Sequence, residues 1–140
     1  MKVAIDDLYG YLQTTPTNGY LNLEVVSIDE GFCKARMPFN PNFTNANGAV
    51  HGGALMTCTD LVFFLALATL NGLGREGELR KPDTSELKIN FLAPCFNSDI
   101  FIEARVIKNG RSLIYGDVSI FNDKNVRISH ATVTYFRKNN

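Results

Sequence analysis

The 140-residue sequence predicts an α+β fold in which a curved antiparallel sheet wraps around one long apolar central helix. The apolar stretch at residues 53–70 is long enough for about five helical turns, and Asp60 is its one charged residue. Segments with alternating apolar residues, typical of strands, stand on both sides of this stretch. Because a helix that is apolar on most faces must be covered, we expect the strands to form a sheet around it.

The first elements are predicted to be a short helix and a hairpin. Apolar residues recur at three- and four-residue spacing over the first dozen positions, which predicts an amphipathic helix ending near Thr14. From Tyr20 the spacing changes to two residues. This change predicts two strands, at residues 21–28 and 32–39, joined by a turn at Asp29-Glu30-Gly31.

Two loops and four strands make up the rest of the prediction. Residues 40–50 are rich in Asn, Pro and Gly and predict an irregular loop that leads into the central helix, and a second loop is expected at 71–83. Tight turns are predicted at Asn109-Gly110 and Asn122-Asp123. No internal repeat divides the chain, so we expect residues 1–140 to form a single domain. The four strands are predicted at residues 84–93, 100–108, 112–121 and 126–137.

Composition excludes several kinds of partner. The 14 basic and 14 acidic residues cancel, so we expect no nucleic-acid partner. The 3 cysteines are widely separated and form no ligand cluster, so we expect neither a disulfide framework nor a metal site. Acidic residues at Asp6 and Asp7 interrupt any secretory signal, which favours a cytoplasmic protein. Asp60 would cost about 3 kcal/mol in a bilayer, so we expect a buried helix and no membrane partner.

The start of the helix carries the pattern Asn45-x-x-Gly48-x-x-His51-Gly52-Gly53. Adjacent glycines are poor helix formers, so another requirement favours them here. They have no Cβ atom and let a second molecule approach free N–H groups at the positive end of the helix dipole. Such a site suits an oxyanion, for example that of a thioester carbonyl under attack. The alternative is that the glycines only complete a turn or allow close packing.

Asp60 needs a reason to lie in an apolar helix, because a carboxylate there is costly unless it is paired, hydrogen-bonded or used. The structural alternative is a carboxylate capped by Thr57 or Thr59. Gly53 and Asp60 are seven residues apart, on one face of the helix but separated by about 10 Å along its axis. Two helices packed antiparallel across a twofold axis would bring Asp60 to the glycine turn of the other chain. The spacing therefore predicts an active site between subunits.

Other side chains have both a functional and a structural interpretation. His51 is either a general base or a cap of the helix start, and we favour the positional role. Asn45 either orients a water or thioester oxygen or holds the loop. Thr84 either holds the attacking water or simply begins a strand. Phe63 and Phe64 are most simply core residues, although one of them could line an acyl pocket. An apolar pocket lining that includes these two and Phe91 is compatible with aryl or medium fatty acyl groups.

This combination of motifs resembles the PaaI-type branch of the hotdog-fold acyl-CoA thioesterases, within the 4-hydroxybenzoyl-CoA thioesterase superfamily. The resemblance spans about residues 20–136 and is carried by 45–53 with Asp60, by 87–94 (LKINFLAP) and by 108–112. It implies a hotdog fold and hydrolysis of an acyl-CoA to a free acid and coenzyme A. It also implies a homodimer, commonly paired into a homotetramer, with no cofactor beyond the coenzyme A of the substrate.

The resemblance also implies roles for individual residues. Gly52, with Gly53, would supply the oxyanion hole, while Asp60 of the partner chain would act as nucleophile or as base for water. Asn45 would orient water or substrate, and Thr84 would stand where related enzymes carry a polar side chain. The turn that would bind coenzyme A, with Arg111 and backbone amides meeting phosphate, consists of Lys108, Asn109, Gly110, Arg111 and Ser112.

Two other functions are compatible with the sequence. A hydratase or dehydratase would use His51 and Asp60 as an acid–base pair, but nine residues place them on opposite sides of a continuous helix. A non-catalytic acyl-CoA-binding protein would keep the pocket and would not need Asp60. Release of free thiol separates hydrolysis from both alternatives. The sequence leaves the acyl group open.

Overall fold

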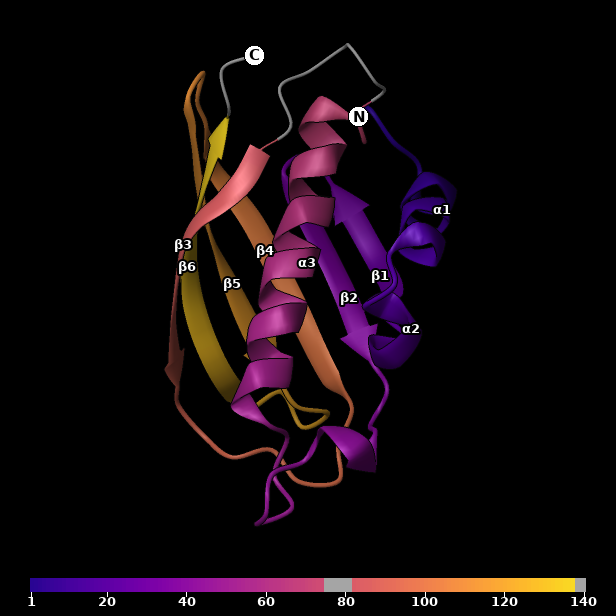
Figure 1. The fold of residues 1–140 in the computed structure, drawn as a ribbon, viewed down its shortest axis with the longest axis vertical. Coiled ribbons are helices and arrows are strands. Elements are labelled where there is room, and N and C mark those ends of the chain that lie inside the picture. The colour runs from indigo at the N-terminus through magenta and orange to yellow at the C-terminus, as the bar shows by residue number, and fades with distance from the viewer. Residues whose placement is uncertain (75–81, 138–140) are drawn as a thin grey trace.

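A computed structural model describes residues 1–74 and 82–137 as a single antiparallel sheet with a long helix across one face (Figure 1). The helix, α3 (Gly52–Asn71), has 20 residues. The strand order within the described residues is β1-β2-β4-β5-β6-β3. These features confirm the predicted α+β architecture. The strands are β1 (Glu24–Asp29), β2 (Phe32–Met37), β3 (Pro82–Phe91), β4 (Ile100–Asn109), β5 (Leu113–Phe121) and β6 (Arg127–Arg137).

The N-terminal region follows the prediction in part. Helix α1 (Ile5–Thr14) forms as expected, but the predicted start of the first hairpin strand is wrong. Its place is taken by a one-turn helix, α2 (Asn18–Leu21), and β1 begins after it. Asn22 ends this turn in the left-handed conformation, with φ 53°, and the Asn18 side chain accepts the Leu23 N–H at 3.0 Å. These local hydrogen bonds outweigh the two-residue apolar spacing.

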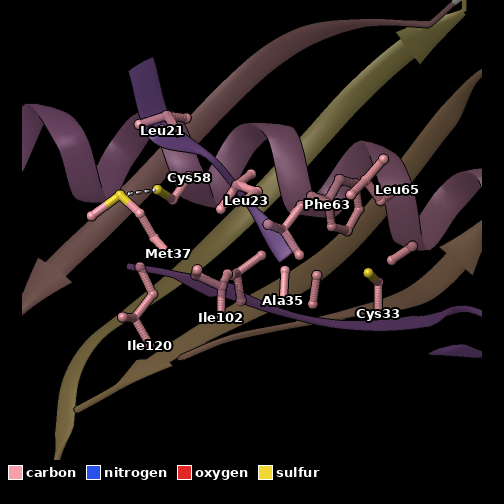
Figure 2. Packing of buried hydrophobic residues seen from close by; sticks show 14 of the residues in the cluster. Leu21, Leu23, Cys33, Ala35, Met37, Cys58, Phe63, Leu65, Ile102 and Ile120 are labelled. Carbon is pink, nitrogen blue, oxygen red and sulfur yellow. Dashed lines mark hydrogen bonds between the residues drawn. The ribbon is translucent and has the colours of Figure 1, made fainter. Parts of the chain in front are cut away.

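Helix α3 and the inner face of the sheet build the core. Figure 2 shows Phe63 and Leu65 of the helix lying against side chains of the central strands, among them Ala35 and Ile102. Phe63, Ala35 and Ile102 are fully buried. Helix α3 is long and apolar enough to cross a membrane, but 61% of its most apolar window lies buried inside the structure. The sheet therefore provides the cover that the sequence requires for this helix.

Strand β3 is an edge of the sheet, and within the described residues it pairs with β6 alone. Most of its side chains are exposed, and Phe91 and the following Leu92 expose 53% and 56% of their surface. The register with β6 shifts between Thr84 and Glu86, which marks a β-bulge. Within the described residues, one edge of β3 is thus without a neighbouring strand, and the bulge in this strand lies near the middle of α3. The loop predicted at 71–83 lies partly outside the described residues.

Candidate functional site

Asp60 lies on α3 and lines a cavity of about 720 Å³. Thr84 Oγ donates a hydrogen bond to Asp60 Oδ1 at 2.7 Å, and the Tyr135 hydroxyl contacts the same oxygen at 3.0 Å and the Asp60 main-chain carbonyl at 2.8 Å. Within the described chain, Asp60 Oδ2 accepts no hydrogen bond. The carboxylate is therefore held through one oxygen, and the other oxygen is available to a reactant.

The prediction that Thr57 or Thr59 caps the Asp60 carboxylate is wrong. Thr57 Oγ donates to the Gly53 carbonyl at 2.9 Å, and Thr59 Oγ donates to the Leu55 carbonyl at 2.7 Å. Both hydroxyls follow the usual pattern of threonine in a helix, bonding one turn back along their own helix. The hydroxyls that bind Asp60 come from the sheet instead.

Tyr135 is a site residue that the sequence analysis missed. Tyr135 occupies one of the alternating buried positions of β6 and exposes 3% of its surface. The pattern therefore predicts an ordinary core residue. Its ring packs edge-on against Phe63 with centroids 4.9 Å apart. Burial, reinforced by the negative charge of Asp60, raises the pKa of Tyr135, so its hydroxyl stays protonated and remains a donor.

The amides of the glycine turn differ in their hydrogen bonds to the described residues. His51 is the N-cap of α3, and its Nδ1 accepts the Gly53 N–H at 2.9 Å. This hydrogen bond caps the start of the helix, which is the positional role that the sequence favours for His51. Gly52 N–H has no acceptor among the described residues. A Cβ atom on Gly52 would lie 3.0 Å from the Phe91 ring, so a side chain here would press on that ring. Of the two adjacent amides, that of Gly52 is the one available to an oxyanion.

Asn45 shapes the loop before the turn. Its Oδ1 accepts the N–H groups of Asn47 and Ala49 at 2.9 and 3.1 Å. Asn45 and Gly52 line a hollow of about 370 Å³ bordered by Phe91. The carboxamide oxygen is thus used by the loop, and any contact of Asn45 with a substrate falls to its NH₂ group.

The predicted catalytic residues form separate groups within one chain. Asp60 and Thr84 share the large cavity, whereas Asn45 and Gly52 line the second hollow. His51 and Gly53 line a third, of about 280 Å³. One chain therefore brings carboxylate and hydroxyl together but leaves the free Gly52 amide elsewhere.

The turn predicted to bind coenzyme A is tied to the large cavity. Asn109 exchanges two side-chain hydrogen bonds with Asn71, at 2.9 and 3.3 Å. Arg137 donates to Asn109 Oδ1 at 2.7 Å and to the Gly110 carbonyl at 3.3 Å. Both Asn71 and Arg137 line the cavity that contains Asp60. Partial burial lowers the pKa of Arg137, a residue that the sequence analysis did not select.

The three phenylalanines considered for an acyl pocket have different positions. Phe64 lines the large cavity and stacks on Tyr11 at 4.8 Å between ring centroids. Phe63 is fully buried, which confirms the simpler interpretation of this residue as part of the core. Phe91 belongs to the hollow above Gly52. Adjacent positions on a helix face different directions, which explains why Phe63 and Phe64 differ.

Sequence comparison links the chain to known proteins. A family model described as the thioesterase superfamily matches residues 47–129. The Saccharolobus solfataricus protein SSO2140 is 30% identical over 99 residues, which are 71% of this chain and 66% of that protein. Acyl-coenzyme A thioesterase PaaI of Escherichia coli is 29% identical over 118 residues, which are 84% of this chain and 75% of PaaI.

Structural comparison gives the same fold. The Escherichia coli PaaI protein from the phenylacetic acid degradation operon superposes with a TM-score of 0.82 and 21% identity, covering 96% of this chain and 92% of that one. The Streptococcus mutans protein smu.793, solved bound to acetyl-CoA, gives a TM-score of 0.72 and 24% identity over 84% of this chain and 89% of its own. These likenesses confirm the predicted hotdog fold.

Proposed function

We propose that this chain, which belongs to the thioesterase superfamily, hydrolyses an acyl-CoA thioester to a free acid and coenzyme A. The observation that carries the proposal is the Asp60 carboxylate on the wall of a cavity of about 720 Å³. Thr84 and Tyr135 hold it through Oδ1, and no described residue donates a hydrogen bond to Oδ2. A carboxylate fixed in this way suits either attack on a thioester carbon or activation of water.

Two courses of reaction fit this geometry. In the first, Asp60 Oδ2 attacks the carbonyl carbon, the carbon–sulfur bond breaks with departure of the coenzyme A thiolate, and water then hydrolyses the acyl anhydride. In the second, Asp60 takes a proton from water as the water attacks. In both, negative charge develops on the carbonyl oxygen, and a Gly52 N–H donating to that oxygen would stabilise it.

We infer that the Gly52 amide comes from a second subunit of a homodimer. The two groups lie eight residues apart on α3, or about 12 Å along the axis. Both hollows border β3, with Thr84 near one end of this edge strand and Phe91 at the other. If β3 pairs with its own copy about a twofold axis near its middle, the Thr84 end of one subunit meets the Phe91 end of the other. The further pairing into a homotetramer stays a prediction, as does the cytoplasmic location.

The coenzyme A moiety is proposed to bind at the turn of residues 108–112. Lys108 and Arg111 are exposed there, and Arg137 connects the turn to the Asp60 cavity through Asn109. Charged side chains and backbone N–H groups at a turn are suited to phosphate oxygens. The substrate would then extend from the turn toward Asp60, with Phe64 beside its acyl group.

The test is thiol release from a panel of short, medium, long and aryl acyl-CoAs, comparing the wild type with Asp60→Asn. We expect turnover in the wild type and a loss of about a thousandfold in the variant, with substrate binding retained, because the amide keeps the shape but not the charge. Asp117→Asn is the matched control, since this carboxylate pairs with His130 away from the cavity. Equal turnover of both variants would refute the assignment, and a lack of turnover in every protein would favour a binding role.

A further inference from the structure

The hydrogen bonds at Asp60 are strongly asymmetric. Both side-chain donors reach Oδ1, and the Tyr135 hydroxyl also reaches the main-chain carbonyl of the same residue. We propose that Tyr135 is a positioning residue, which together with Thr84 fixes the Asp60 side chain so that Oδ2 faces the reaction. This inference deepens the proposed function and rests on it.

A β-bulge brings Thr84 to this arrangement. On β3, Leu87 and Ile89 pack against the core, so a regular two-residue alternation would direct Ser85, and not Thr84, toward the helix. The register instead shifts between Thr84 and Glu86, and Thr84 lies directly opposite Tyr135. The bulge therefore places both donors side by side beneath Asp60, an arrangement typical of bulges near functional sites.

Packing fixes the position of the Tyr135 hydroxyl. The tyrosine ring meets Phe63 edge-on at 4.9 Å, and Phe63 in turn occupies the space above Gly116, where a Cβ atom would overlap its ring. Tyr135 exposes 3% of its surface. A ring held on this side by aromatic packing has little freedom to move its hydroxyl away from Asp60.

The chemistry of the neighbouring groups fits a fixed donor. The raised pKa of Tyr135 keeps its hydroxyl protonated throughout the pH range of an ordinary assay. The other titratable or charged side chains that line the same cavity among the described residues are Tyr11, Asp83 and Arg137. Two donors on Oδ1 hold the carboxylate in one orientation, so the loss of one donor is expected to let the Asp60 side chain turn.

The test is Tyr135→Phe, which removes the hydroxyl and keeps the ring. We expect kcat to fall about tenfold with KM changed less than about twofold, because a hydrogen bond to a charged group is lost where the reaction occurs. Tyr9→Phe is the matched control, because its hydroxyl bonds to the Val25 main chain and does not line the cavity.

A second measurement separates this proposal from the thioesterase assignment. In crystal structures of the free protein, the Asp60 carboxylate should have one orientation in the wild type and more than one in Tyr135→Phe and in Thr84→Val. If the wild type releases no thiol but the carboxylate loses its single orientation in the variants, the thioesterase assignment fails and the positioning role stands. If Asp60 keeps its wild-type orientation in Tyr135→Phe, the positioning role is refuted.

Discussion

The two ends of the proposed site are completed to different degrees by a single chain. Around Asp60, strands β3 and β6 of the same chain supply two hydroxyl donors to Oδ1, and Oδ2 accepts no hydrogen bond from the described residues. At the start of α3, the Gly52 amide has no acceptor among the described residues, and its hollow borders the edge strand β3. Folding of one chain thus fixes the position of the Asp60 carboxylate, whereas the Gly52 amide is left able to donate a hydrogen bond to a bound molecule.

This difference indicates how the work of catalysis is divided. The position of Asp60 depends on sheet register and on the bulge between Thr84 and Glu86, so it is set within each subunit. The proposed oxyanion hole depends on the backbone at Gly52, and it meets Asp60 only if a second chain covers β3. Substitutions at Gly52 and around Asp60 test this division, and their expected effects differ in size.

After that of Asp60→Asn, the largest effect is expected from Gly52→Pro, which deletes the proposed oxyanion donor. Gly52 is the first residue of α3, a position that proline favours, and the preceding His51 has the extended conformation that proline requires, with φ −65° and ψ 136°. We expect kcat to fall about 100- to 1000-fold with the thermal unfolding temperature nearly unchanged.

Gly52→Ala is the control for that substitution, because it keeps the N–H and adds the same contact with Phe91, where a Cβ atom would lie 3.0 Å from the ring. Steady-state thiol release from the best acyl-CoA of the panel is the measurement for both variants. If Gly52→Ala loses as much activity as Gly52→Pro, then steric pressure on Phe91, and not the missing amide, accounts for the loss.

The division between subunits is tested by mixing two inactive proteins. Asp60→Asn and Gly52→Pro, unfolded together at equal amounts and refolded, should form mixed dimers with one intact site of the two. Random assembly makes half of the dimers mixed, so about a quarter of the wild-type activity should return. If both groups acted within one chain, every site would carry a defect and the mixture would stay inactive. Each variant refolded alone is the control.

A smaller effect is expected from Thr84→Val, which removes one of the two donors to Asp60 Oδ1 while Tyr135 keeps the other. A hydrogen bond to a charged group contributes about 1.5 kcal/mol or more, so kcat should fall about tenfold. Thr84→Ser keeps a hydroxyl and should retain most of the activity. Equal kcat values for the valine and serine variants would show that this hydroxyl does not position the carboxylate.

Local patterns allowed much of the fold to be predicted from the sequence. The long apolar run defined α3, and two-residue alternation defined the strands after it, because both signals depend on neighbours in the chain. The start of the first hairpin was predicted wrongly because hydrogen bonds of Asn18 favour a helical turn there. Phe63 and Phe64 could not be separated, since which of them faces the core depends on how α3 is rotated against the sheet.

The candidate site was predicted only where its residues form a sequence motif. Asp60 and Gly52 stand out because a charge in an apolar helix and paired glycines at its start both need an explanation. Tyr135 and Arg137 stand in a strand 75 and 77 residues after Asp60 and give no local signal. They reach the site only through the pairing of β6 with β3 and β5. Such contacts depend on register, which a single sequence does not reveal.

The smallest effect is expected at the coenzyme A end of the cavity. Arg137→Met removes a charge held at the turn by Asn109 and should raise KM for an acyl-CoA about fivefold, since a partly exposed ion pair contributes about 1 kcal/mol. The same acyl group on N-acetylcysteamine lacks the nucleotide phosphates, so its kcat/KM should be unchanged. Lys124→Met, in the turn between β5 and β6, is the control. An equal loss on both substrates would mean that Arg137 stabilises the cavity wall and does not act through the turn that binds coenzyme A.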